Sequence, residues 1–317
     1  MTQQTIKVSI RGIRIEAEHI RSFELVATDG AALPAWQAGA HVQVTLPNSI
    51  QRAYSLCNHL GEHSGYRIAV KLEAQSRGGS RAMHALQVGQ TLQISAPRNL
   101  FELDPSAQRH VLLAGGIGIT PLYAMCNALQ GMAACELHYF VRHPDQAAFL
   151  DRLGDQVVLH TGLDAAHTER TLADLVAHHA DAPRTTFYTC GPSPFMAAVE
   201  TALRTAKFPI ERLRSERFSA EPPAPGYRNN AFHIVFAKSG IEADVPPGIP
   251  IIQVARECGV DIPTSCEQGV CGACLSEVLE GAPDHLDAYL SDAERTSGKL
   301  MLPCVSRCTG KTLVLNR

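Results

Sequence analysis

The sequence predicts a multidomain protein with three modules: an antiparallel β-barrel, an α/β domain with a parallel sheet, and a small α+β domain. Three observations favour this fold class. Strand-like segments dominate the first hundred or so residues, strands and helices alternate after that, and a proline-rich stretch precedes a segment with six of the ten cysteines. We expect the modules at residues 1–104, 105–218 and 230–317, with a linker at 219–229.

The barrel is predicted from a period of two in the sequence. Apolar and polar residues alternate in residues 41–46 and 66–72, and glycine or proline separates such runs. This alternation is typical of strands with one buried face, and few helical periods compete with it in the first module. An antiparallel barrel is therefore the expected architecture there.

The second module is predicted from strands and helices that follow each other in turn. Short apolar strands are expected at residues 110–114, 137–141, 157–160 and 185–190. Helices are expected from residue 121, near 146–153, and at 171–179 and 194–204. This order is typical of a parallel sheet that helices cover on both faces.

A stiff linker is expected at residues 219–226, because three prolines and a glycine in eight residues can continue neither a helix nor a strand. In the third module we expect a hairpin at 232–237 and 241–245, a short helix at 250–257 and a closing strand at 312–315.

The composition excludes several classes of protein. Hydrophobic residues make up 45% of the 317, the formal net charge is −3, and the mean hydropathy is close to zero. No apolar run reaches the roughly 20 residues that a membrane helix needs, the first residues do not resemble a signal peptide, and there is no basic excess for nucleic acid. We expect a cytoplasmic protein, simplest as a monomer, with neither membrane nor nucleic acid as its partner.

The cysteines of the third module carry the most specific motif. Cys266, Cys271 and Cys274 form a C-x4-C-x2-C pattern, and Cys304 follows after a long gap. This spacing matches the plant-type 2Fe–2S cluster, whereas zinc prefers paired C-x2-C knuckles. Gly269 and Gly272 let the loop turn its amides toward the cluster. Cys308 is an alternative fourth ligand, but Cys304 lies in the more sheltered sequence and is preferred.

Two motifs in the first module are suited to a flavin. The segment 52–56 reads R-A-Y-S-L, which supplies a cation for phosphate, an aromatic ring for the flavin and a hydroxyl near its N5 atom. The segment 77–80 reads R-G-G-S, in which adjacent glycines allow backbone amides and a serine hydroxyl to contact phosphate oxygens. The first motif alone is weak, since an Arg–Tyr pair on a strand is usually ordinary surface.

Two strand-to-helix turns in the second module are suited to a nicotinamide dinucleotide. Residues 115–121 read G-G-I-G-I-T-P and residues 190–196 read C-G-P-S-P-F-M. Glycines at the start of a helix let amides approach a pyrophosphate, although the G-x-G-x-x-G fingerprint is absent. A purely structural turn and a buried core thiol at Cys190 are the alternatives.

The motifs and their order together resemble the family of phthalate dioxygenase reductase and the vanillate O-demethylase reductase component. The resemblance covers essentially the whole chain and includes E-R-F at residues 216–218. It implies a ferredoxin-reductase type barrel with FMN rather than FAD, a nicotinamide domain that favours NADH over NADPH, and a β-grasp ferredoxin domain.

The resemblance also implies the residues of the sites. The catalytic residues it implies are Ser55, Thr120 and Cys190, with Cys190 near the reactive carbon of nicotinamide. FMN would be held by Arg52, Ala53, Tyr54, Ser55, Val70, Lys71, Gly78, Gly79, Ser80 and Phe218. NAD would be held by Gly115, Gly116, Gly118, Thr120, Pro121, Arg142, Cys190, Gly191, Pro192, Phe195 and Met196. For Phe218, a core position between domains is an equal alternative.

The expected function is that of the reductase component of a Rieske-type aromatic ring oxygenase or demethylase. Electrons would pass from NADH through FMN to the 2Fe–2S cluster and on to the oxygenase, in aromatic hydrocarbon catabolism. The alternatives are a reductase for a different hydroxylase, a free flavin or quinone reductase, and a non-catalytic iron–sulfur redox sensor.

Overall fold

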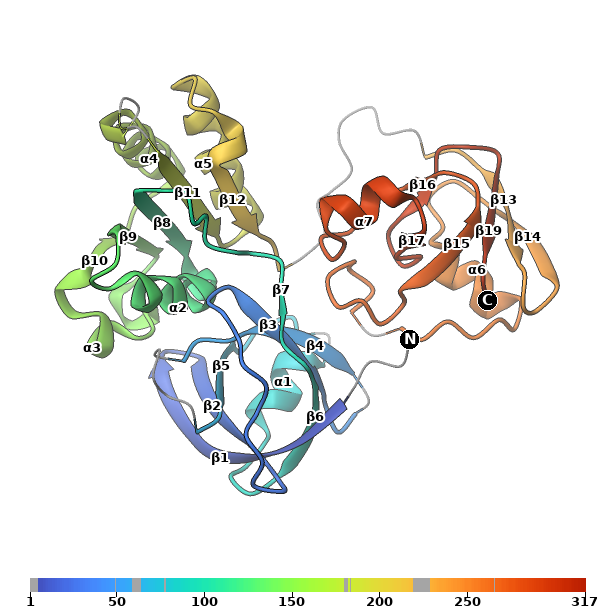
Figure 1. The fold of residues 1–317 in the computed structure, drawn as a ribbon, viewed down its shortest axis with the longest axis horizontal. Coiled ribbons are helices and arrows are strands. Elements are labelled where there is room, and N and C mark those ends of the chain that lie inside the picture. Colours follow the sequence, from blue (N-terminus) through green and yellow to red (C-terminus); the bar gives the residue numbers. More distant parts are fainter. Residues whose placement is uncertain are drawn as a thin grey trace. The chain divides into compact units, whose positions relative to one another are not determined.

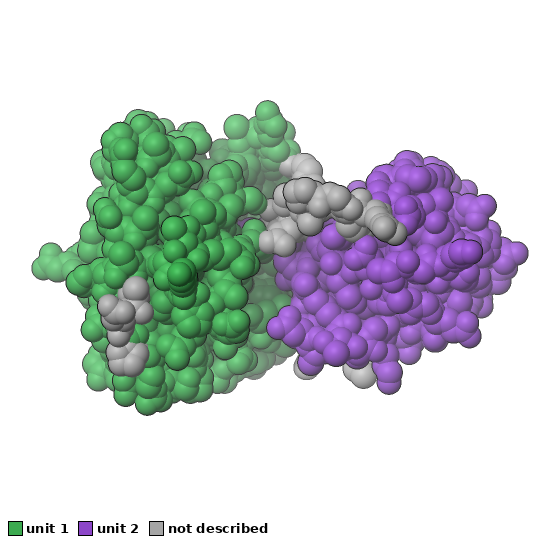
Figure 2. Space-filling view, turned by 90° about the horizontal axis from the view of Figure 1, so that it is seen from above, with its two compact units in different colours: residues 1–48, 53–217 green, residues 49–52, 218–317 purple. Residues whose placement is uncertain are grey.

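The computed structural model describes residues 5–48, 50–58, 64–76, 78–179, 182, 184–218, 229–264 and 266–317. The chain divides into two compact units: residues 1–48 with 53–217, and residues 49–52 with 218–317 (Figure 2). The predicted linker at 219–229 lies almost entirely outside the described residues, as do Arg77 of the R-G-G-S motif and Ser265. None of the described helices is long and apolar enough to cross a membrane.

The first module folds into a closed antiparallel barrel (Figure 1). Its strands follow the order β4-β3-β6-β1-β2-β5, and β7 pairs with β3. Leu56, directly after β4, bridges to Ile68 of β5, which joins the two ends of the sheet. The elements are β1 (Thr5–Ala17), β2 (Ile20–Ala27), β3 (Ala40–Thr45), β4 (Gln51–Ser55), β5 (Tyr66–Lys71), α1 (Gly79–His84), β6 (Thr91–Ser95) and β7 (Arg98–Asn99).

The second module is a five-stranded parallel sheet with helices on both faces (Figure 1). The strand order is β10-β9-β8-β11-β12, so β8 is the central strand and β11 lies next to it. Their residues are nearly all buried, as the continuous apolar runs predict. The elements are β8 (Arg109–Gly115), η1 (Gly116–Gly118), α2 (Ile119–Leu129), β9 (Ala134–Val141), η2 (Pro144–Gln146), α3 (Leu150–Leu153), η3 (Gly154–Gln156), β10 (Val157–Thr161), α4 (Ala165–His179), β11 (Thr185–Cys190), α5 (Ser193–Thr205), η4 (Ile210–Arg212) and β12 (Leu213–Glu216).

One hydrophobic cluster connects the barrel with this sheet. It joins Ile20, Cys57 and Phe101 of the barrel module to the buried face of α2 and to Leu112 of β8. A second cluster on the opposite face of the sheet packs α4 and α5 against alternate strand residues such as Val111. The barrel and the sheet therefore share part of their core.

The third module has a mixed sheet in the order β14-β13-β19-β15-β17, in which β13 and β19 run parallel. The apolar face of α6 packs on this sheet and completes a separate core. The elements are β13 (Phe232–Phe236), β14 (Ile241–Val245), α6 (Ile251–Glu257), β15 (Ser276–Glu280), β16 (Pro283–Asp284), α7 (Asp292–Ser297), β17 (Leu300–Met301), β18 (Arg307–Cys308) and β19 (Thr312–Leu315).

The helix expected near residues 146–153 is wrong in its extent. The chain forms a 3₁₀ turn up to Gln146 and only one α-helical turn, α3. Between them Phe149 takes a left-handed φ of 66° and stacks on Tyr123 with ring centroids 4.6 Å apart. Burial of this ring interrupts the helix that the sequence pattern suggested.

Candidate functional site

The four cysteines of the predicted metal site lie together as two pairs. All four are buried, and the thiols of Cys266 and Cys271 are hydrogen-bond partners, as are those of Cys274 and Cys304. Among the described residues, no three His, Cys, Asp or Glu side chains converge on a single ion position. Two pairs of thiols are what a cluster with two irons requires, because each iron takes two cysteine ligands.

Backbone amides point at these sulfurs. The neighbouring Cys271 thiol, helped by the amides of Val270 and Gln268, lowers the pKa of Cys266 against the opposing effect of burial. The Gln268 amide donates to the Cys266 sulfur at 3.2 Å, and the Gly269 amide donates to Cys304. The donor set and its amides therefore fit an anionic, thiolate-bound cluster.

The two loop glycines are required by space as well as by conformation. Gly269 and Gly272 have φ angles of 68° and 72°. A Cβ atom on Gly269 would lie 2.6 Å from the side chain of Val305, and one on Gly272 would lie 2.3 Å from the ring of Tyr289. The loop is thus held close to neighbouring segments on both sides.

The other two cysteines of this module have different surroundings. The Cys308 thiol donates to the carbonyl of Thr312 at 3.5 Å and accepts from the Gly310 amide, so it is engaged at the end of the sheet. Cys258 lies directly after α6 and is half-buried.

The residues predicted to hold a flavin come from three parts of the barrel. Arg52, Ala53, Tyr54 and Ser55 lie along β4. Val70 and Lys71 end β5, where Val70 is buried and Lys71 forms an exposed ion pair with Glu73. Gly78, Gly79 and Ser80 form the turn into α1, with Gly78 at a φ of 91° and the Ser80 hydroxyl accepting the Glu73 amide.

The residues predicted to hold a nicotinamide dinucleotide meet at the carboxyl edge of the parallel sheet. A Cβ atom on Gly118 would lie 2.1 Å from the Cys190 carbonyl oxygen, and one on Gly191 would lie 3.0 Å from Gly115. The two strand-to-helix turns therefore touch backbone to backbone. This contact explains why residues 118 and 191 are glycines even without a ligand. Position 116 has open space around it, and its φ of 54° favours glycine there.

The remaining predicted residues are distributed over the same edge. Thr120 is buried and its hydroxyl donates to the Ile117 carbonyl at 3.1 Å, which closes the η1 turn. Arg142 is exposed just after β9. Along α5, Met196 is buried, while the ring of Phe195 packs at a tilt against that of Phe140, with ring centroids 5.1 Å apart. Pro121 is buried in the first turn of α2, and Pro192 precedes α5.

Glu216 is the site residue that sequence reasoning missed. It ends β12, and the strand register places it beside Cys190. Its Oε2 atom accepts the Ser55 hydroxyl at 3.0 Å. Ser55 comes from the barrel, so this bond joins the predicted flavin and nicotinamide motifs in one unit. The E-R-F motif contained Glu216, but nothing in the sequence indicated its partner.

Burial sets the protonation of this group. Burial raises the pKa of Glu216 to about 7, while the hydrogen bond from Ser55 opposes the rise. Burial, reinforced by the Glu216 carboxylate, also raises the pKa of Cys190 well above that of an ordinary thiol. Cys190 is therefore a neutral thiol at physiological pH, suited to packing against a ring rather than to nucleophilic attack.

Phe218, the remaining residue predicted to hold the flavin, is 41% exposed and begins the longer of the two segments that form the second compact unit.

Comparison with known proteins finds similarity over the full chain. The chain is 40% identical to the vanillate O-demethylase oxidoreductase of Pseudomonas sp. (strain HR199 / DSM 7063), over 98% of this chain and 99% of that protein. It is also 40% identical to the carnitine monooxygenase reductase subunit of Escherichia coli (strain K12), over 99% of this chain and 98% of that protein.

Solved structures give the same result. Phthalate dioxygenase reductase, described as a modular structure for electron transfer from pyridine nucleotides to a 2Fe–2S cluster, matches with 34% identity and a TM-score of 0.71 over 99% of this chain and 98% of that chain. A type IV self-sufficient cytochrome P450 monooxygenase matches with 36% identity and a TM-score of 0.83 over 99% of this chain, which spans 41% of that larger chain. The 2Fe–2S iron–sulfur cluster binding domain family matches residues 235–309. These matches confirm the predicted multidomain fold class.

Proposed function

The chain belongs to the family of phthalate dioxygenase reductase and vanillate O-demethylase oxidoreductase, and on this basis we propose that it carries electrons from NADH to a separate Rieske-type oxygenase or demethylase. The path runs through FMN and through the chain's own 2Fe–2S cluster. The protein is an oxidoreductase, and its acceptor is another protein.

One observation supports this path most strongly. The same chain carries a Ser55–Glu216–Cys190 group, with Ser55 and Cys190 buried, between two nucleotide-binding motifs and, in its other unit, two pairs of buried thiols with the 2Fe–2S spacing. A flavin held by the barrel motifs would supply the exchange between a two-electron donor, NADH, and a one-electron acceptor, the cluster that the four cysteines would hold. A reductase for a one-electron acceptor needs both kinds of site.

The chain's own residues align the two rings and exclude water. In this proposal Gly78–Ser80 and Arg52 hold the FMN phosphate, and Tyr54 packs against the flavin. Cys190 presents a neutral thiol to nicotinamide, which favours close approach of donor and acceptor. The Ser55 hydroxyl and the Glu216 carboxyl hold a proton at Oε2 near neutral pH. No nucleophile is required.

The domains are assigned accordingly: residues 1–104 bind FMN, 105–218 bind NADH, and 230–317 hold the cluster through Cys266, Cys271, Cys274 and Cys304. The proposed protein is a cytoplasmic monomer that meets its oxygenase transiently. The substrate of that oxygenase binds to the oxygenase and not to this chain, so this sequence does not identify it.

A second candidate acceptor is a different hydroxylase. The chain's likeness to part of a cytochrome P450 monooxygenase supports this alternative, because an oxygenase of another class occurs there together with a similar portion. Purified Rieske oxygenase and purified P450, each offered as acceptor with NADH, distinguish the two by which one is reduced.

The decisive variant is Cys271→Ser. We expect it to keep NADH-dependent reduction of ferricyanide, which accepts electrons from flavin, and to lose most reduction of cytochrome c, because one cluster ligand is missing. Stopped-flow absorbance and iron analysis measure both. Cys258→Ser is the matched control, and it should leave both activities unchanged. Intact cytochrome c reduction in an iron-free Cys271→Ser protein would show that the cluster does not lie on the path, and an NADH-inactive wild type would favour a redox sensor.

A further inference from the structure

A buried carboxylate lies beside the cysteine loop without being part of it. Asp287 follows β16 and precedes α7, and its side chain has no exposed surface. A carboxylate in such a place is costly unless hydrogen bonds and charges satisfy it. Its partners therefore indicate what the residue is for.

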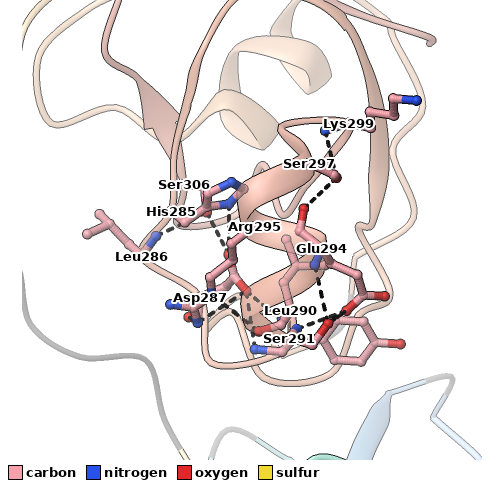
Figure 3. A network of polar contacts seen from close by, with 11 residues as sticks. His285, Leu286, Asp287, Leu290, Ser291, Glu294, Arg295, Ser297, Lys299 and Ser306 are labelled. Atoms are coloured by element: carbon pink, nitrogen blue, oxygen red, sulfur yellow. Dashed lines mark hydrogen bonds and ion pairs between the residues drawn. The ribbon is translucent and has the colours of Figure 1, made fainter.

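The carboxylate of Asp287 has hydrogen-bond partners in its own segment and in the segment that contains Ser306 (Figure 3). Its Oδ2 atom accepts the amides of Tyr289 at 3.2 Å and Leu290 at 2.9 Å. Its Oδ1 atom accepts the hydroxyl of Ser306 at 3.1 Å. The His285 ring lies 3.5 Å away, and the Arg295 guanidinium lies 3.8 Å away and also donates to the Asp287 carbonyl.

The amide bonds fix the segment that supports the cysteine loop. The Ala288 amide donates to the Gly269 carbonyl at 2.9 Å. The Asp287 Cα would lie 2.9 Å from a Cβ on Gly269, and the Tyr289 ring fills the space beside Gly272. Residues 287–289 thus pack directly on the loop that carries Cys266, Cys271 and Cys274.

The hydroxyl bond reaches the segment of the remote cysteine. Ser306 lies two residues after Cys304, is buried, and also accepts the Leu286 amide at 3.2 Å. The sequence separation between Cys274 and Cys304 is long, so local chain geometry does not set their spacing. The carboxylate of Asp287 joins the segment of residues 287–290, which supports the cysteine loop, to the segment that carries Cys304.

We propose that Asp287 is a positioning residue for the 2Fe–2S cluster, which through the amides of residues 289–290 and the Ser306 hydroxyl fixes Cys304 against the three-cysteine loop. The inference rests on the proposed ligand set. Asp287 binds no iron itself, and its effect passes through the two segments that it joins. Residues that orient ligands in this way typically change metal affinity by about 10–100-fold when replaced.

Two substitutions test the bridge in the full-length holoprotein. Asp287→Asn keeps the shape of the side chain but loses the charge, and Ser306→Ala removes only the hydroxyl that leads to the Cys304 segment. We expect iron release to a chelator to be faster by about tenfold in Asp287→Asn and by a smaller factor in Ser306→Ala. The double variant should release iron no faster than Asp287→Asn, because both changes break one link.

The electron paramagnetic resonance spectrum and the midpoint potential of the reduced cluster give readouts that general destabilisation does not move. Both should change in the two variants. Glu294→Ala is the matched control, since it removes the capping box of α7 nearby but leaves the Asp287–Ser306 bond in place. It should lower the melting temperature and leave the spectrum unchanged.

The proposal is overturned if Ser306→Ala and any folded Asp287→Asn protein keep the wild-type spectrum, potential and iron-release rate. It is also overturned if Glu294→Ala changes them equally. Cys304→Ser and Cys308→Ser test the ligand set separately. If only Cys308→Ser alters the spectrum, the proposed ligand is wrong and the bridge fails with it, whereas an effect of Cys304→Ser alone leaves the bridge to be decided by the two substitutions.

Discussion

Glu216 illustrates how the chemistry of a single side chain depends on residues that the sequence keeps far apart. Ser55, which donates to it, lies 161 positions earlier in the chain. Burial raises the pKa of its carboxyl to about 7, so the group titrates near neutral pH. A carboxylate at a strand end is ordinary in sequence, and for that reason sequence reasoning assigned it no role.

Replacing Glu216 with Gln should remove a titration near neutral pH. In the folded state the pKa of Glu216 lies at about 7, above its ordinary value of 4.5. Between these values the folded protein binds more protons than the unfolded chain, so stability falls as pH rises through this window. Wild type should therefore lose up to about 3 kcal/mol relative to Glu216→Gln between pH 4.5 and pH 8. Thermal melts at several pH values measure the difference.

Ser55→Ala provides the matched variant at this site. The Ser55 hydroxyl favours the ionised form of Glu216. Without this hydroxyl the pKa of Glu216 should rise, and the inflection in the pH dependence of flavin reduction should lie at higher pH than in wild type. Stopped-flow reduction by NADH across pH 6 to pH 9 records the inflection. An inflection that is the same in Glu216→Gln as in wild type would assign the titration to another group.

The elements were largely predictable because their hydrophobic patterns are strong. The strand at residues 185–190 and the closing strand at 312–315 have the predicted bounds, and the alternating module has the predicted parallel sheet. The helix near 146–153 was not predictable, since burial of Phe149 is a tertiary effect. Four short elements between Pro283 and Cys308 also went unpredicted, because two-residue strands and a single turn of helix leave no periodic pattern.

The two strand-to-helix turns were predicted to hold a nicotinamide dinucleotide, and the structure shows that they also contact each other. A Cβ atom on Gly118 would overlap the backbone of Cys190, which cannot yield as a side chain can. Their closeness depends on β8 and β11 being neighbours in the sheet, and the sequence does not state this order.

Gly118→Ala should therefore move the Cys190 turn away from α2. We expect a loss of stability of about 1–3 kcal/mol and slower reduction of flavin by NADH. Gly131→Ala is the control, because it lies outside the predicted sites, meets open space and costs only the left-handed backbone strain of about 1–2 kcal/mol. Thermal unfolding and single-turnover flavin reduction distinguish the two. Equal effects of both changes on hydride transfer would argue against a role for the contact between the turns.

At the scale of the whole molecule, the module with the cysteines has a core of its own. Phe232, Ile251 and Leu313 belong to a cluster made only of residues after 230. We therefore expect residues 229–317 to fold when expressed alone and to take up a cluster with the same paramagnetic resonance spectrum as the full chain. Residues 1–218 should still reduce ferricyanide with NADH but not cytochrome c. Failure of the short fragment to hold iron under reconstitution would mean that its stability depends on the rest of the chain.

The shared cluster around α2 has a practical consequence for anyone who recombines such reductases. Ile20 and Phe101 from the barrel module pack in one hydrophobic cluster with Leu112 from the sheet. A crossover between these two modules would combine core residues from different parents that do not fit each other. Chimaeras should therefore exchange the barrel and the parallel-sheet module together, up to residue 217, and exchange the module with the cysteines separately. Chimaera libraries with the crossover at the boundary between the two compact units should contain a larger fraction of folded proteins than libraries with the crossover near residue 105.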